Sequence, residues 1–471
     1  SLQTRANRDE IMKITCISIA PIFVNQVIGG SQKILIEVMQ GLSKKGHSVQ
    51  IMATHNGNVT SEFKYKDIVI KPILKFRGAF PSTHQIPPYD LINNRKSLHE
   101  NTADSDVVFL HADSLFIRPN FHNAKIIRSL HDYVYEESLL SSLLLPADIT
   151  VVPSTYLKKT VETTVVMSNL RDLEDIVVIP NGVSGYLTPK TRSIPHRLKN
   201  RSNDDLIILF PHRADRKKGF KEAVNICNKL QAKIDNKTVR LFIPFYNDDR
   251  ERDESSYGYS ELQQIINDLD TGKVVELHNW LDTDEVHRYL SLGDVVINPG
   301  AFVESFGLVP LESVLAGTPA VCSRVGALRD LEGIPGLYHV DYGDIDGFVE
   351  KIIEAINVDQ STLDDGKAHV ETVYSIESMI DGYDEVMTGS YDKTKKMTLD
   401  EHHLVLAPWC YKNGNFIYND YSSKFHHYPK LNDVFSFFPG TTINLNKFSS
   451  PDILMEINKA REEGCLTPLI V

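Results

Sequence analysis

Residues 1–190 alternate between two patterns of hydrophobic and polar positions. Short runs of β-branched and other apolar residues are typical of buried strands, and longer segments carry apolar residues at helical spacing. Such alternation is typical of a parallel sheet with helices on its faces. We therefore expect an α/β fold whose first domain, residues 1–190, is Rossmann-like. The clearest segments are 13–20, 31–46, 47–54, 106–112, 124–131 and 149–154.

A second series with the same pattern follows the polar, proline-containing segment 191–205, which we predict to be a linker. Strand and helix patterns alternate again over residues 206–375, which predicts a second Rossmann-like domain. The carboxyl ends of parallel strands open onto crevices in sheets of this kind. Two such domains are therefore expected to face a central cleft that binds the ligand.

The pattern changes after residue 375. Residues 376–395 are interpreted as a closing amphipathic helix and a linker, and residues 396–471 as a small extra α+β module. In that module Asn413 and Gly414 predict a hairpin turn, and the Ser-Pro start of residues 450–465 predicts a capped helix. A packing role for this aromatic-rich module is favoured, and oligomerisation and acceptor docking are the alternatives.

Composition and charge narrow the class of protein. The 471 residues are 42% hydrophobic and 24% charged, as in an ordinary globular protein with more than one domain. The net charge of −12 argues against nucleic acid or an anionic membrane as the main partner. The five cysteines are scattered without a CxxC pair, and the N-terminus carries no signal or membrane-span pattern. A cytoplasmic enzyme is expected, and no oligomeric state is indicated.

The strongest candidate for chemistry is the segment 297–321, in which a strand, a glycine turn and a helix follow one another. Gly307 lets a ligand approach the backbone closely, and the amides of Leu308 and Val309 with the positive end of the helix form a binding position for phosphate. Glu304 before the turn and Glu312 within the helix can accept hydrogen bonds from sugar hydroxyls. The pattern therefore indicates a nucleotide-sugar, although a loop carboxylate and a helix-surface carboxylate without a ligand are the simpler alternative.

The sequence "ESFGLVPLE" within residues 294–331 resembles the signature of glycosyltransferase family 4, a retaining family with the GT-B fold. The resemblance implies that Glu304 holds the donor sugar and Glu312 the ribose. It also places Ser305, Phe306, Gly307 and Leu308 at the donor.

Upstream, "LFPHRADRKKGF" is similar to the family segment that binds the donor diphosphate. The resemblance implies this role for Arg213 and Lys218, whose guanidinium and ammonium can neutralise the leaving group. A basic surface loop is the alternative for this segment.

Segments of the first domain also resemble the family. Gly29 and Gly30 match its first glycine turn, and His131 matches a histidine close to the donor sugar. Residues 178–183, "VIPNGV", match a segment that leads toward the second domain. Taken alone, the glycine pair is also explained by an ordinary turn, and His131 by a structural role.

The loop after residue 277, which contains Trp280, resembles the family stretch that receives the nucleotide base. The chain departs from the family at Gly326, Ala327 and Asp330, where a second glycine and a glutamate are common. No convincing DxD metal motif is present, so no metal ion and no other cofactor are expected.

These resemblances imply a retaining glycosyltransferase of the hexosyltransferase type, which moves a sugar from a nucleoside diphosphate sugar to an acceptor hydroxyl. A nucleotide-sugar epimerase, a GT-B phosphorylase and a non-catalytic sugar-nucleotide-binding subunit are the alternatives. The acceptor is left open. Because no basic amphipathic helix marks membrane association, a soluble acceptor is slightly favoured.

Overall fold

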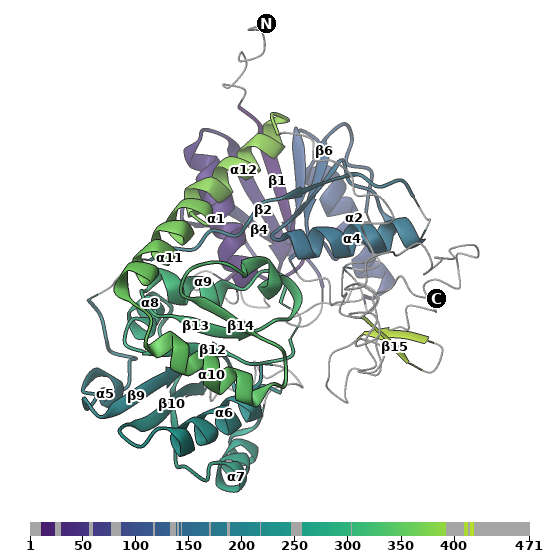
Figure 1. The fold of residues 1–471 in the computed structure, drawn as a ribbon. Coiled ribbons are helices and arrows are strands. Elements are labelled where there is room, and N and C mark those ends of the chain that lie inside the picture. The colour runs from purple at the N-terminus through teal and green to yellow at the C-terminus, as the bar shows by residue number, and fades with distance from the viewer. Residues whose placement is uncertain are drawn as a thin grey trace, which may run out of the picture. The chain divides into compact units, whose positions relative to one another are not determined.

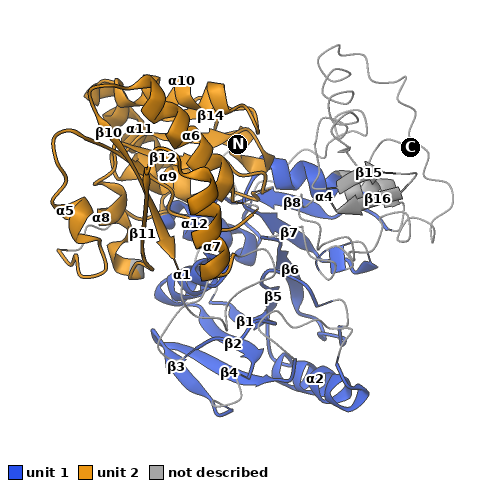
Figure 2. Cartoon of the chain, turned by 90° about the horizontal axis from the view of Figure 1, so that it is seen from below, with its two compact units in different colours: residues 1–182, 376–418, 429–471 blue, residues 183–375, 419–428 orange. Residues whose placement is uncertain are grey.

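The computed structural model describes residues 11–23, 30–55, 60–76, 86–115, 118–131, 138, 141–142, 144–168, 171–185, 189–216, 218–245, 257–302, 304–391, 409–412 and 415–418. Within this part the chain forms two compact units (Figure 2). Unit 1 contains the chain up to Gly182 and again from Ile376, and unit 2 contains Val183–Ser375.

Unit 1 is built on an eight-stranded sheet with the order β3-β4-β2-β1-β5-β6-β7-β8 (Figure 2). All neighbouring strands pair in parallel except β3 and β4, which are antiparallel. The strands are β1 Lys13–Ser18, β2 Ser48–Thr54, β3 Phe63–Tyr65, β4 Ile68–Leu74, β5 Val107–Leu110, β6 Lys125–Ser129, β7 Ile149–Val152 and β8 Asp175–Val178. The helices are α1 Gly30–Lys44, α2 Pro88–Asn101, α4 Thr155–Ser168 and α12 Ile376–Thr388.

Alternation along the central strands of unit 1 divides its apolar side chains between two faces. In β5, Val107 and Phe109 join a buried cluster with residues of α1 and α12. Val108 and Leu110 join a second cluster that contains Leu98 of α2. The sheet is therefore covered on both faces, as the continuous apolar runs predict.

Unit 2 has a six-stranded, wholly parallel sheet with the order β11-β10-β9-β12-β13-β14. The strands are β9 Asp205–Leu209, β10 Thr238–Phe245, β11 Val275–Asn279, β12 Val295–Asn298, β13 Ala320–Ser323 and β14 Leu337–Val340. The α-helices are α5 His196–Lys199, α6 Phe220–Lys233, α7 Tyr259–Leu269, α8 Val286–Leu290, α9 Leu308–Leu315, α10 Ile345–Ile356 and α11 Gln360–Val373, and the 3₁₀ turns are η3 Thr283–Glu285 and η4 Gly326–Leu331. Buried clusters lie on both faces of this sheet. The predicted pair of Rossmann-like α/β domains is confirmed.

The segment 191–205, predicted to be a linker, is instead packed into unit 2. Ile194 and Leu198 are buried in one of its apolar clusters. The amides of Arg192 and Ser193 donate to the carboxylate of the buried Glu285 at 2.9 and 2.8 Å. In the sequence, the boundary between the units falls between Gly182 and Val183 rather than between residues 190 and 191. The linker prediction was wrong because the segment is mostly polar, and only the side chains of Ile194 and Leu198 join the apolar cluster.

The predicted closing helix is present as α12, but it belongs to unit 1. Its Tyr383 is 1% exposed and meets Phe109 of β5 edge to face, with ring centroids 5.7 Å apart. α12 also packs against α1 (Figure 1). The chain thus leaves unit 1 at Gly182 and returns at Ile376, and these points are neighbours: a Cβ added to Gly182 would lie 2.5 Å from the Ile376 Cα.

In the C-terminal module the structure describes only β15 Trp409–Lys412 and β16 Asn415–Tyr418. They pair antiparallel with Lys412 opposite Asn415, which confirms the predicted hairpin. The predicted helix at 450–465 lies outside the described residues. Across the described part of the chain, no helix combines the length and apolar character needed to cross a membrane.

The packing of α12 gives a stability prediction. Tyr383→Ala is expected to lower the free energy of unfolding of unit 1 by about 3–5 kcal/mol, because it leaves a cavity beside Phe109. Glu377→Ala, at an exposed position of the same helix, should change it by less than about 0.5 kcal/mol. Urea unfolding with amide hydrogen exchange of β5 as the readout measures both, and equal effects would contradict the assignment of α12 to unit 1.

Candidate functional site

Two glycines bring the loops after β9 and β12 of unit 2 together. Gly219, which caps the N-terminus of α6, has φ +86°, a conformation that favours glycine. A Cβ at this position would lie 2.6 Å from the backbone nitrogen of Gly300. The loop after β12 therefore lies directly against the start of α6.

This contact brings Lys218 and Glu304 into an ion pair. The Lys218 Nζ lies 2.5 Å from the Glu304 Oε1, and the two side chains are 24% and 18% exposed. The ammonium also lies 4.1 Å from the centroid of the Phe302 ring. Two residues that the sequence analysis assigned to different parts of one ligand are thus adjacent, at the carboxyl edge of the sheet.

Gly307 forms the predicted turn before α9. It caps the helix N-terminus with φ +103°, and a Cβ there would lie 2.6 Å from the Cδ2 atom of Leu328. The backbone amides at the start of α9 lack intrahelical partners and carry the positive end of the helix dipole. The segment 326–330, whose sequence differs from the family pattern, lies close to this turn, because the amide of Ala327 donates to the backbone oxygen of Glu304 at 2.8 Å.

In the basic loop before α6, Arg216 contacts residues outside the loop. Arg216 pairs with Glu261 of α7 at 2.6 Å, and its guanidinium lies 4.6 Å from the ring centroid of Tyr257. Arg213 in the same loop is exposed. The loop is therefore held in place by Arg216, and Lys218 turns toward Glu304.

The remaining predicted donor-binding residues of unit 2 differ in how far their side chains are exposed. Phe306 is 4% exposed and packs edge to face against Tyr374, so only its backbone is available to a ligand. Ser305, Leu308 and Glu312 are partly exposed around the turn. Trp280, which follows β11, is 41% exposed and so presents its indole at the surface.

A buried histidine in this region was missed by the sequence analysis. His212 follows β9, is 6% exposed, and bonds the backbone of Ile297 in β12. Burial, together with the charge of Lys218, lowers its pKa to about 3. Its Nε2 atom has no hydrogen-bond partner among the described residues. The sequence shows that His212 directly precedes Arg213 in the basic segment, but it does not predict that the imidazole is buried.

In unit 1 the predicted His131 lies just past the end of β6, beside a second histidine. Its ring centroid is 4.7 Å from that of His111, which follows β5. The Nε2 atom of His111 lies 2.9 Å from the hydroxyl of Ser31, in the first turn of α1. Burial lowers the pKa of His131 to about 4, and its Nε2 has no hydrogen-bond partner within the described ranges. Gly30 begins α1 and is exposed, and Gly29 lies outside the described residues.

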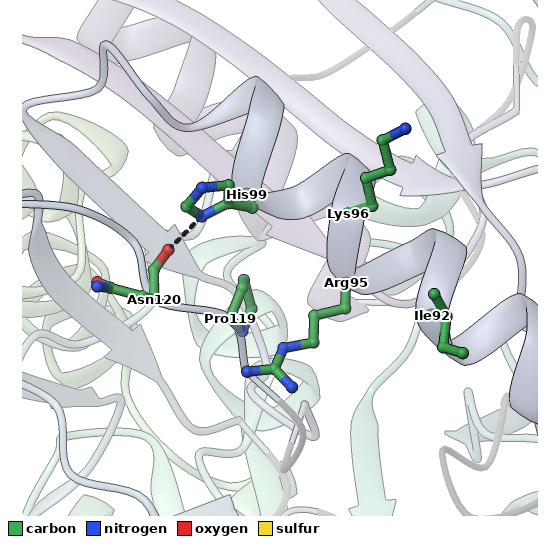
Figure 3. Close-up of a pocket in the computed structure, with 6 residues that line it drawn as sticks. All are labelled: Ile92, Arg95, Lys96, His99, Pro119 and Asn120. Carbon is green, nitrogen blue, oxygen red and sulfur yellow. Dashed lines mark hydrogen bonds between the residues drawn. The ribbon is translucent and has the colours of Figure 1, made fainter.

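A cavity of about 450 Å³ lies against α2 in unit 1 (Figure 3). No residue predicted for the site from the sequence lines this cavity. In the part of the chain that the structure describes, no group of three or more His, Cys, Asp or Glu side chains is placed to hold a metal ion. The lining residues of the cavity are Ile92, Arg95, Lys96, His99, Pro119 and Asn120.

Two family models match the chain. The model of glycosyl transferases group 1 matches residues 193–367, and the model of glycosyltransferase family 4 matches residues 28–184. The matches fall on unit 2 and on the N-terminal part of unit 1, respectively.

Several curated proteins are similar in sequence. A lipopolysaccharide 1,2-N-acetylglucosaminetransferase from Salmonella typhimurium (strain LT2) is 24% identical over 321 residues, which are 65% of this chain and 79% of the relative. A D-inositol 3-phosphate glycosyltransferase from Paenarthrobacter aurescens (strain TC1) is 34% identical over 163 residues, 33% of this chain. The chain spans 37% of the length of that second relative.

Solved structures share the fold at low sequence identity. Sucrose-phosphate synthase from Thermosynechococcus elongatus has a TM-score of 0.62 and 17% identity, over 80% of this chain and 99% of that chain. The Anabaena HepE protein in complex with UDP-glucose has a TM-score of 0.59 and 16% identity, over 80% and 100% of the two chains. These likenesses establish the two-sheet GT-B architecture.

The buried histidines predict a dependence of stability on pH. The pKa of His131 is about 4 in the folded protein and that of an unfolded histidine is near 6.5, so the unfolded chain binds protons first. Stability from this residue is fully present above pH 6.5 and is lost as the pH falls toward 4. The free energy of unfolding of unit 1 should therefore fall between pH 6.5 and 4.5, at up to about 1.4 kcal/mol per pH unit for each such histidine.

His131→Gln should make this slope shallower, because the variant lacks the titrating imidazole. Urea unfolding at a series of pH values, read by amide exchange in β6, measures the slope. Glu174 should not affect the slope in this range. Its carboxyl is desolvated, but the charge of Arg128 and bonds from Arg171 hold its pKa at about 2, so its stabilising contribution is lost only as the pH falls below about 4.5. An unchanged slope in the variant would refute the prediction.

Proposed function

From the premise that the chain belongs to the glycosyltransferases with the GT-B fold, we propose that it transfers a sugar from a nucleoside diphosphate sugar to an acceptor hydroxyl. The observation that carries this proposal is the adjacency of Lys218, Glu304 and the α9 N-terminus in unit 2. The ammonium and the backbone amides at the start of α9 suit the diphosphate of a nucleotide-sugar, and the carboxylate suits the hydroxyls of its sugar.

The cationic groups act on the leaving diphosphate. Negative charge develops on the phosphate as the glycosidic bond breaks, and preorganised donors that face this charge lower the barrier. Lys218 supplies an ammonium, Arg213 a guanidinium, and the turn at Gly307 backbone amides. Because Lys218 is bonded to Glu304, a diphosphate that binds here shares or takes over the ammonium.

The carboxylates bind hydroxyl groups. Glu304 accepts hydrogen bonds from the donor sugar, and Glu312, one turn into α9, accepts them from the ribose. Trp280 is exposed at the end of β11 and offers its indole to the base. In unit 1, the neutral, buried His131 binds a hydroxyl of the donor sugar.

We propose that the reaction retains the anomeric configuration. The resemblance to family 4 implies this outcome, and in the arrangement proposed above Glu304 binds hydroxyls of the donor sugar rather than attacking its anomeric carbon. A same-face route, in which the acceptor attacks beside the departing diphosphate, fits this arrangement. Proton NMR of the product, which distinguishes the two anomers, tests the assignment.

UDP-sugars are the first donors to test. The Anabaena HepE structure contains UDP-glucose, and the Salmonella relative is named for transfer of N-acetylglucosamine. The names of the relatives include a lipopolysaccharide and an inositol phosphate transferase, so their acceptors differ in class. We therefore propose a UDP-hexose donor and an acceptor that carries a free hydroxyl.

Donor binding is expected to stabilise the folded protein. At a donor concentration 100 times its dissociation constant the stabilisation is about 2.7 kcal/mol, which raises the melting temperature by several degrees. A thermal-shift panel of UDP-, GDP-, ADP- and TDP-sugars, with free glucose as the negative control, measures this effect. The absence of a shift with every nucleotide-sugar would count decisively against the proposal.

Lys218→Ala and Glu304→Ala are each expected to lower transfer, or donor hydrolysis where no acceptor is supplied, by about 100-fold or more. Arg95→Ala, at an exposed arginine of the α2 cavity, is the matched control and should keep wild-type activity. Activity is measured as release of the nucleoside diphosphate, with circular dichroism to verify folding.

The same assay separates the alternatives. Sugar 1-phosphate formed from a glycoside and inorganic phosphate would indicate a phosphorylase. Conversion of the free nucleotide-sugar without an acceptor would indicate an epimerase, and donor binding without turnover a non-catalytic subunit. Wild-type activity in both alanine variants would overturn the placement of the site.

A further inference from the structure

We propose that His212 is a further donor-binding residue, whose unprotonated Nε2 accepts a hydrogen bond from a hydroxyl of the hexose. This inference rests on the proposed function and assigns one more contact within the same site. It names the kind of ligand atom that the imidazole binds, which must be a hydrogen-bond donor.

The first step is the position of the ring. His212 follows β9, and its imidazole bonds the backbone of Ile297 in the neighbouring strand β12. The loops that leave these two strands carry Lys218 and Glu304, which form the ion pair, and they touch where Gly219 meets Gly300. The imidazole therefore lies at the base of the two loops, on the carboxyl edge of the unit 2 sheet.

The second step is the missing partner. His212 is 6% exposed, and its Nε2 atom is buried without a hydrogen-bond partner among the described residues. Leaving a buried polar atom unpaired costs about 1–3 kcal/mol, so such atoms call for an explanation. A ligand that supplies the missing bond explains why this position carries a histidine rather than an apolar side chain.

The third step is the protonation state. With Nε2 unpartnered, the bond to Ile297 is made by Nδ1, and a backbone carbonyl accepts only from an N–H group. Nδ1 therefore carries the proton. Burial and the nearby positive charge of Lys218 oppose a second proton, so the ring stays neutral and Nε2 presents a lone pair.

The fourth step is the class of ligand atom. An ionised diphosphate oxygen carries no hydrogen and would be repelled by the Nε2 lone pair, whereas a hydroxyl can donate to it. The hexose and the ribose both carry hydroxyls. The hexose is the better match because Glu304 pairs with Lys218, in the loop that begins beside His212, whereas Glu312, assigned to the ribose, lies further along the chain within α9. Trp280, on the base side, follows β11, and β10 separates that strand from β9.

Two amide variants separate binding from structure. His212→Asn places an amide N–H near the position of Nδ1, so it can keep the bond to Ile297, but it has no atom at the position of Nε2. His212→Gln places its amide near Nε2 and can offer an oxygen acceptor there. Calorimetric titration with UDP-glucose and with UDP distinguishes contacts to the hexose from contacts to the rest of the donor.

The asparagine variant should bind UDP-glucose at least 10-fold more weakly than wild type and UDP within 2-fold of it. The glutamine variant should recover most of the lost UDP-glucose affinity. A solely structural role would instead lower the melting temperature of the ligand-free protein in both variants and leave the ratio of the two affinities unchanged. An unchanged ratio, or an equal loss for UDP, overturns the assignment to a hexose hydroxyl.

Failure of the assignment and failure of the proposed function give different results. If wild type binds neither UDP-glucose nor any other sugar of the nucleotide panel, the proposed function falls and the assignment falls with it. If wild type binds a nucleotide-sugar and His212→Asn binds it equally well, only the role of His212 is overturned.

Discussion

The ion pair between Lys218 and Glu304 depends on how closely two stretches of backbone approach each other. Gly219 meets Gly300 at a distance that no side chain would tolerate, and this contact sets the separation of the loops after β9 and β12. The same geometry brings an ammonium, a carboxylate and the N-terminus of α9 together at one edge of a parallel sheet. Polar chemistry is concentrated at this edge because the strands themselves are buried on both faces.

Unit 1 repeats this principle with different side chains. His111 and His131 follow neighbouring strands, and burial keeps both imidazoles neutral because it lowers their pKa. Ser31 connects His111 to the first turn of α1. Each unit thus offers a buried, neutral histidine whose Nε2 has no hydrogen-bond partner in the part of the chain that the structure describes, His131 in unit 1 and His212 in unit 2. A lone pair in such a position selects ligand groups that carry a hydrogen, and sugars are rich in these groups.

Much of this architecture could be predicted from local sequence. The apolar runs predict both sheets, and the glycine at position 307 predicts the turn before α9. Three features could not be predicted, for identifiable reasons. The segment 191–205 looks like a linker because its burial depends on only two apolar side chains, Ile194 and Leu198. The destination of α12 is a tertiary property, which its amphipathic pattern does not encode. The role proposed for His212 rests on its burial and on its bond to a neighbouring strand, and both depend on tertiary structure.

The return of α12 to unit 1 makes that unit discontinuous and affects how the protein folds as it is synthesised. The buried cluster that contains Phe109 also includes Met379, Tyr383, Val386 and Met387 of α12, which leave the ribosome after Val183–Ser375 of unit 2. The described residues of unit 2, Val183–Ser375, are continuous in the chain and can close their own core first. Until α12 emerges, the nascent first unit has an uncovered hydrophobic face, which makes it a natural client for a chaperone and makes residues 1–182 a poor fragment to express alone.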